Sequence, residues 1–233
     1  LDGMTDPPGQ GEAFFGLGSE EIAAEIHLEA GEPVSIVVEY SSEGAFMFRG
    51  AQVGLRPPDD GDLIERAEAL AAASDVVVLV VGTNDDWETE GRDRGSMDLP
   101  GDQPELIRRV VAANPRTVVV VNAGSVVTMD WADEAPAVIQ TWFGGQEMAD
   151  ALVDVLFGEA EPGGRLPTTV PRRLEDTPAF TNYPGENGEV RYGEGVFVGY
   201  RWYDARDVDP CFPFGHGLGY GTVGWGRAAV SGE

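Results

Sequence analysis

The sequence predicts an α/β fold in which helices cover a parallel β-sheet. Three β-branched or apolar runs, at 76–81, 117–122 and 137–142, alternate with segments whose apolar residues recur at helical spacing. Near-continuous Val and Ile runs are typical of parallel strands that are buried on both faces. Alternation of strands with helices indicates a sheet built from successive strand–helix units. With 233 residues, the chain is long enough to bury a sizeable core.

Three helices are expected around these strands. The first is the Ala-rich segment 61–74, and the second is 104–114, with Asp102 as its N-cap and a proline in its first turn. The third is 146–156, which is followed by Gly158 as its C-cap. Each helix lies next to a predicted strand in the sequence, as a covered sheet requires.

The two ends of the chain follow other patterns. Residues 1–57 contain runs at 22–27, 33–40 and 46–55 that predict a short antiparallel β segment before the α/β part. Because three strands alone make a poor independent domain, this segment is expected to be the end of a larger β module. From residue 159 onward the chain is rich in Gly, Pro and aromatic residues, which is typical of a strand and ordered loops around the sheet.

Charge and hydropathy exclude several classes of partner. The 41 acidic residues outnumber the 15 basic residues and give a net charge of −26, which disfavours nucleic acid and anionic membrane surfaces as partners. The longest apolar run, 76–81, is far shorter than the ~20 residues that span a bilayer. The N-terminus lacks the basic and apolar regions of a signal peptide, which favours the cytoplasm without excluding secretion.

The acidic loop at 82–100 is the first place to look for chemistry. It leaves the carboxyl end of a predicted strand, where open parallel sheets bind their ligands, and long ordered loops are usually functional. A solvated loop in an acidic protein is the competing interpretation. No metal site is expected, because the spacing of an EF-hand is absent and no His lies near. The loop contains Trp87 and six carboxyl side chains: Asp85, Asp86, Glu88, Glu90, Asp93 and Asp98.

Other catalytic templates are absent from the sequence. There is no G-x-S-x-G nucleophile turn, no phosphate-binding Walker loop and no H-E-x-x-H helix. Ser125 follows a predicted strand but has no base near it in the sequence. His27 and His216 are interpreted as structural residues. The acidic loop therefore remains the leading candidate.

Four motifs follow one another along the chain: GTNDDWETEGRDRGSMDLPGDQ, QTWFGGQEMADALVDVLFG, YGEGVFVGYRWYD and FPFGHGLGY. In this order they resemble the C-terminal α/β domain of family 3 glycoside hydrolases, the β-glucosidase family. The resemblance implies an (α/β)6 sandwich at 58–220, beside an N-terminal (β/α)8 barrel. It also implies that 1–57 is the end of an inserted PA14-like β module. Residues 221–233 look like a linker towards a fibronectin-III-like domain.

The resemblance implies a retaining mechanism, in which two carboxyl groups about 5–5.5 Å apart flank the glycosidic bond. The acid/base of many family members is the Glu of an E-G-x-D-R motif, which assigns that role to Glu90 here, with Glu88 as the runner-up. Trp87 is expected to contact substrate. Asp93 and Arg94 are expected to fix the loop.

The family's nucleophile belongs to the barrel, and no credible nucleophile is found in this chain. Asp130, in a Met-Asp-Trp triplet, imitates the nucleophile motif but follows a sandwich strand, so it is interpreted as a decoy. The chain is therefore expected to be the acid/base half of a retaining β-glycosidase that acts from the non-reducing end, without a cofactor. A barrel would be supplied in cis or in trans. The alternative is a non-catalytic carbohydrate-binding or scaffolding module. A phosphorylase is disfavoured because the loop has no His.

Overall fold

The computed structural model describes most of the chain and divides it into two compact units. The first unit comprises Leu1–Leu63 and Asp85–Asp93, and the second comprises Ile64–Asn84 and Arg94–Glu233. The described residues are 18–41, 50–58, 61–91, 93–224 and 226–229.

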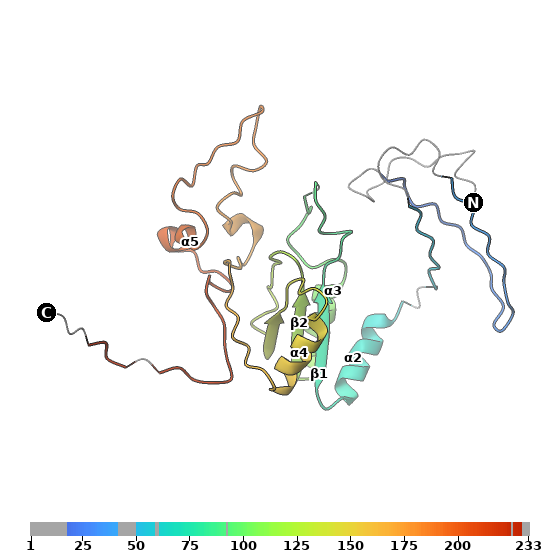
Figure 1. Cartoon of the computed structure of the whole chain (residues 1–233), viewed down its shortest axis with the longest axis horizontal. Helices are drawn as coiled ribbons and strands as arrows, with labels where there is room; N and C mark the ends of the chain where they lie inside the picture. The colour runs from blue at the N-terminus through green and yellow to red at the C-terminus, as the bar shows by residue number, and fades with distance from the viewer. Residues whose placement is uncertain (1–17, 42–49, 59–60, 92, 225, 230–233) are drawn as a thin grey trace. The chain divides into compact units, whose positions relative to one another are not determined.

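A parallel three-stranded sheet forms the centre of the second unit (Figure 1). Its strands are β1 (Val77–Gly82), β2 (Thr117–Asn122) and β3 (Ala137–Gln140), in the order β1-β2-β3. The predicted parallel sheet is confirmed. The third strand ends two residues earlier than predicted, although the backbone N–H of Thr141 still donates to the carbonyl oxygen of Val121 at 3.0 Å.

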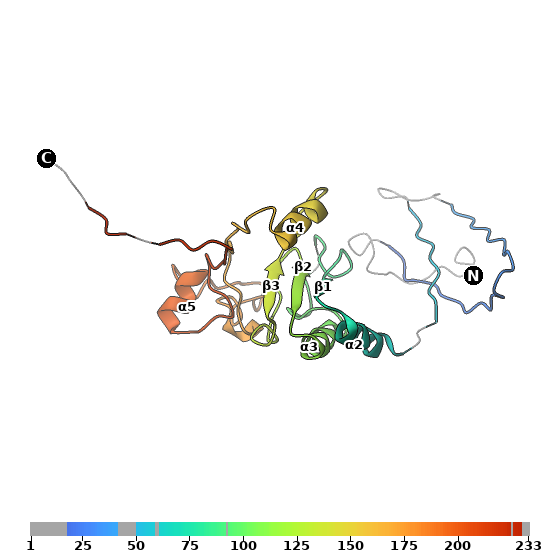
Figure 2. The ribbon, with the colours of Figure 1, turned by 90° about the horizontal axis from the view of Figure 1, so that it is seen from below.

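The three predicted helices are α2 (Leu63–Ala73), α3 (Gln103–Ala113) and α4 (Met148–Phe157). In Figure 2, α2 and α3 lie on one face of the sheet and α4 lies on the other, so both faces carry helices. Gly158 caps α4 with a left-handed φ of 79°, as predicted. Asp102 occupies the N-cap position of α3, but its side chain makes no capping hydrogen bond. Within the described residues, no helix combines the length and apolar character needed to cross a membrane.

The core lies between the sheet, α3 and the segment 123–131, with β2 at its centre. Val119 and Val121 of β2 and Ile107 of α3 are completely buried, and Trp131 is 1% exposed. Burial of each such side chain stabilises the fold by roughly 1.5–3 kcal/mol. The continuous apolar sequence of β2 thus matches its central position.

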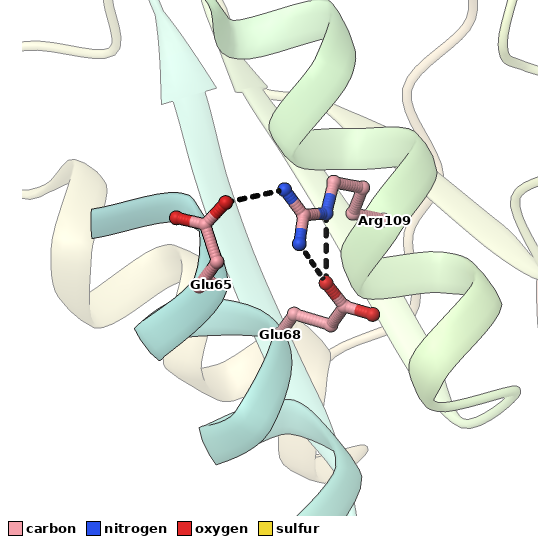
Figure 3. Close-up of polar contacts among 3 residues, drawn as sticks. All are labelled: Glu65, Glu68 and Arg109. Carbon is pink, nitrogen blue, oxygen red and sulfur yellow. Dashed lines mark hydrogen bonds and ion pairs between the residues drawn. The ribbon is translucent and has the colours of Figure 1, made fainter. Parts of the chain in front are cut away.

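One arginine fastens α2 to α3 (Figure 3). Arg109 donates from Nη1 to Glu65 at 3.1 Å, from Nε to Glu68 at 2.7 Å, and from Nη2 to the same Glu68 oxygen. A hydrogen bond from its own backbone amide, followed by the bond from Arg109, lowers the pKa of Glu65. The carboxylates of Glu68 and Glu65 raise the pKa of Arg109. The two helices are therefore joined by ion pairs between their side chains.

The predicted antiparallel β segment is not formed by the described residues. No strand covers 22–27, 33–40 or 50–55, so these strand predictions are wrong, while 46–49 lies outside the described residues. A strand needs a partner for its backbone hydrogen bonds and a surface that covers its apolar face. Val37, in the most β-branched of these runs, is 79% exposed. The run has β propensity but lacks a covered face.

The C-terminal part contains a helix that the sequence patterns do not predict. Helix α5 (Tyr200–Arg206) has seven residues, and its aromatic-rich sequence hides the helical spacing. A single 3₁₀ turn, η1 (Leu174–Asp176), precedes it. The strand expected after residue 159 is not formed by the described residues, where Val170 and Phe212 form only an isolated antiparallel bridge. Within α5, Tyr203 is the buried residue, with 6% of its surface exposed.

Candidate functional site

The acidic loop begins where β1 ends, very close to β2. Gly82 is the last residue of β1, and a Cβ placed there would lie 1.9 Å from the carbonyl oxygen of Asn122. The next residue, Thr83, donates its backbone N–H to that oxygen at 3.1 Å. Only glycine permits this close approach, so the start of the loop is fixed by backbone contacts.

The loop returns to the same edge of the sheet, along the segment that follows β2. Arg94 donates from Nη2 to the carbonyl oxygen of Val126 at 2.7 Å. Thr128 donates its backbone N–H to Met97 at 2.9 Å and its hydroxyl to the carboxylate of Asp98. The returning part of the loop is therefore bound to residues 126–128 by backbone and side-chain hydrogen bonds.

The tip of the loop, Asp85–Asp93, carries the residues predicted to do chemistry and belongs to the first compact unit. Trp87 is 40% exposed, Glu88 is half-buried, and Glu90 and Asp93 are exposed. Gly91 has a φ of +82°, which permits the turn directly after Glu90. Both candidate acids have some access to solvent, as a group that exchanges protons with a substrate and with water requires.

An open depression of about 540 Å³ lies at the carboxyl ends of β2 and β3. Trp142 and Phe143 follow β3 directly, and the patterns used above do not single them out as site residues. Trp142 has a φ of 55°, a left-handed backbone that is costly for a bulky residue and is concentrated at functional sites. The Trp-Phe-Gly-Gly sequence directly after β3 is the signal that could indicate this site. The depression is lined by Gly124, Ser125, Val126, Trp142, Phe143, Pro167 and Thr168.

The Met-Asp-Trp triplet is part of the folded scaffold. Trp131 is 1% exposed within the core, and Asp130 accepts a hydrogen bond at 2.5 Å from Arg108 of α3. A nucleophile needs to face an open pocket, whereas Asp130 is paired with an arginine. The interpretation of Asp130 as a decoy stays a prediction.

His216 and Cys211 lie against other residues of the second unit. The ring of His216 lies 5.1 Å from that of Phe212. The thiol of Cys211 contacts the carbonyl oxygen of Met129 at 3.6 Å, and burial raises the pKa of this thiol. Among the residues that the structure describes, no three His, Cys, Asp or Glu side chains are grouped closely enough to hold a metal ion.

A parallel sheet with helices on both faces defines the second unit as an α/β domain. In open sheets of this class, ligands bind at the carboxyl ends of the strands. Residues 17–220 match the glycosyl hydrolase family 3 C-terminal domain, and the chain therefore belongs to that family. The resemblance drawn from the motifs is confirmed for the α/β domain. The PA14-like origin of 1–57 stays a prediction.

Relatives in this family are similar over much of the chain. A β-glucosidase of Rhizobium radiobacter is 44% identical over 239 residues, which cover 99% of this chain and 29% of that protein. The crystal structure of the Kluyveromyces marxianus β-glucosidase in complex with glucose has a TM-score of 0.70 and 46% identity, covering 72% of this chain and 20% of that one. DesR, a β-glucosidase from Streptomyces venezuelae in complex with D-glucose, has a TM-score of 0.63 and 41% identity over 67% of this chain and 20% of that one. The chain spans less than a third of the length of these relatives.

Proposed function

We propose that this chain is the acid/base-bearing part of a retaining β-glucosidase-like glycosidase. The observation that carries the proposal is the E-G-R-D-R sequence at 90–94, which stands in a loop at the carboxyl end of β1 in a chain 44% identical to a β-glucosidase. Glu90 is exposed in this loop and is the proposed acid/base. Glu88, which is half-buried, remains the second candidate.

In the proposed mechanism, Glu90 acts twice. It first donates its proton to the glycosidic oxygen as the sugar leaves, and it later takes a proton from the water that releases the sugar. The second carboxyl group, the nucleophile, comes from a (β/α)8 barrel in cis or in trans. Asp93 and Arg94 hold the loop, Trp87 contacts substrate, and no cofactor takes part.

The proposed substrate is a β-linked glucoside cleaved from its non-reducing end. Three of the solved relatives are complexes with glucose, which supports a glucose-sized ligand. The names of the relatives favour hydrolysis over a purely carbohydrate-binding or scaffolding role.

We also propose a division of the chain into three parts. Residues 58–220 form the α/β domain, 1–57 form the end of a PA14-like module, and 221–233 form a linker. The exposed β-branched residues of 33–40 support the second part, because they present apolar surface that further strands of a β module would cover.

The proposal is tested by the dependence of rate on the leaving group, in the polypeptide that joins this chain to its barrel. Glu90→Ala removes the proton donor and leaves the barrel nucleophile in place. We expect cellobiose turnover to fall by roughly 10²–10⁴-fold, because an alkoxide is a poor leaving group without protonation. Aryl glucosides with acidic phenols should lose less in the first step, which is measured as burst release of nitrophenol.

Glu88→Ala is the matched control, since it removes the same group two residues away. It should retain the wild-type dependence on the leaving group. If Glu88→Ala shows the selective loss instead, the acid/base is Glu88. If neither variant shows it, the loop does not supply the proton.

A further inference from the structure

The base of the acidic loop is closed by one glutamine side chain. Gln103, the first residue of α3, accepts the backbone N–H of Gly82 on Oε1 at 2.7 Å. Its Nε2 donates to the carbonyl oxygen of the same Gly82 at 2.9 Å. The backbone N–H and carbonyl of Gly82 are therefore both hydrogen-bonded to the half-buried side-chain amide of Gln103, which lies 21 positions further along the chain.

This pairing takes the place of a neighbouring strand. Alternate residues of a strand turn their backbone groups to opposite edges, and the N–H of Thr83 faces β2. The N–H and carbonyl of Gly82 therefore face the outer edge of β1, where no described strand pairs with it. The amide of Gln103 offers one acceptor and one donor in the arrangement that a backbone peptide would offer.

The two hydrogen bonds between Gln103 and Gly82, here called the clamp, join the two ends of the loop. Gly82 starts the loop and Gln103 follows its end. Arg94 and Thr128 bind the returning half to the sheet unit, and Leu99 is 3% exposed. The tip between these fixed ends carries the proposed acid/base. A general acid has to be held close to its productive position, because a displacement of about 1 Å can cost a hundredfold in rate.

We propose that Gln103 is a positioning residue for the acid/base: its amide closes the base of the loop and so limits the positions open to Glu90. This inference rests on the proposed function for its catalytic consequence, but the clamp itself can be tested without any activity. Gln103 touches the backbone of Gly82 and acts on the reaction only through the loop.

The clamp is tested first on the whole chain with a glutamate-specific protease. Gln103→Met removes both hydrogen bonds, and cleavage after Glu88 and Glu90, identified by product mass, should accelerate about tenfold. Gln103→Glu removes only the donor at pH 8. At pH 4, below the ordinary pKa of a glutamate of about 4.3, the carboxyl is mostly protonated and can donate again. Its cleavage rate, relative to wild type, should therefore return towards one at pH 4, while that of Gln103→Met should not.

Gln146→Met is the control, because Gln146 is an exposed glutamine whose side chain bonds to its neighbour Glu147 at 3.1 Å. It should cleave at the wild-type rate at both pH values. Wild-type rates in Gln103→Met would overturn the clamp. So would the absence of pH-dependent recovery in Gln103→Glu.

The catalytic consequence is tested in the polypeptide joined to its barrel. For Gln103→Met, kcat/KM for cellobiose should fall roughly tenfold. For an aryl glucoside with an acidic phenol, kcat/KM should stay within about twofold of wild type, because the phenol leaves with little protonation. Equal losses for both substrates would overturn a positioning role while leaving the clamp intact. A lack of any leaving-group effect in Glu90→Ala would instead contradict the proposed function and leave the protease result unaffected.

Discussion

Two β-branched runs of similar composition differ in structure: β2 is a buried strand, whereas 33–40 is exposed and forms no strand. In β2, Val119 and Val121 are fully buried between a parallel strand on each side and a core formed with α3 and the segment 123–131. In the run 33–40, Ile36 and Val37 are 69% and 79% exposed, and no strand forms. The side chains alone do not decide the outcome. A β-branched run becomes a strand when partners satisfy its backbone and cover its side chains.

The largest expected effect comes from a matched pair of isoleucines. Ile107 of α3 is completely buried, so Ile107→Ala leaves a cavity and should lower the free energy of unfolding by about 2–5 kcal/mol. Ile36→Ala removes the same atoms from a 69% exposed side chain and should change it by less than about 0.5 kcal/mol. Urea unfolding measures both variants. A large loss for Ile36→Ala would mean that the N-terminal run packs against a surface and would break the comparison.

A matched pair of glycines tests the same difference, between the packed sheet and the exposed N-terminal region, at the backbone. In Gly82→Ala the new Cβ meets the carbonyl oxygen of Asn122 at 1.9 Å, which forces β1 away from β2. We expect a loss near the upper end of the roughly 1–3 kcal/mol typical of overpacking. Gly54→Ala adds a methyl group where no atom lies within 4 Å. Thermal unfolding of Gly54→Ala should match wild type, and equal melting temperatures for both variants would contradict the close approach.

The smallest effect concerns two arginine–glutamate contacts and their dependence on pH. The pKa of Glu65 is lowered from 4.5 by its own backbone amide and by Arg109. A lowered folded-state pKa stabilises the fold above the unfolded-state value and loses this contribution as the pH falls through the folded-state value. The difference in unfolding free energy between wild type and Glu65→Gln should therefore be positive near neutral pH and vanish in acid.

The control for this contact lies in the N-terminal region. Arg56 contacts Glu21 at 3.2 and 3.3 Å, with both side chains more than 70% exposed. Exposed ion pairs contribute little to stability. Glu21→Gln should therefore leave the urea midpoint unchanged at every pH. A pH-dependent difference for Glu21→Gln as large as that for Glu65→Gln would contradict the contrast between the two regions.

Sequence patterns predict the sheet unit well because its signals are local and mutually consistent. The Val run of β2 matches the buried position of that strand. Gly158 matches the left-handed backbone that ends α4, so local signal and fold agree in both cases. The same reasoning fails for 33–40, because a run of β-branched residues does not tell whether another segment covers it. It also misses α5, where seven aromatic-rich residues are too few to show a helical period.

In the candidate site, too, sequence patterns predict some features and miss others. The acidic loop could be found from its place after a strand and from its E-G-R-D-R motif. The clamp by Gln103 could not, because nothing in the sequence links a glutamine in the first turn of a helix to a glycine 21 residues earlier. Trp142 and Phe143 were missed because their position after β3 matters more than their residue types. Contacts between distant segments are the part that only the structure supplies.

Chemical rescue tests the central claim, that Glu90 is the acid/base, most directly. In the polypeptide joined to its barrel, Glu90→Ala should form the glycosyl-enzyme from an activated aryl glucoside and then stall, because no base activates water. Azide needs no base and fits where the carboxylate stood. It should restore turnover and give the β-glycosyl azide, with retained configuration. Rescue of Glu88→Ala but not of Glu90→Ala, or rescue of neither variant, would contradict the assignment.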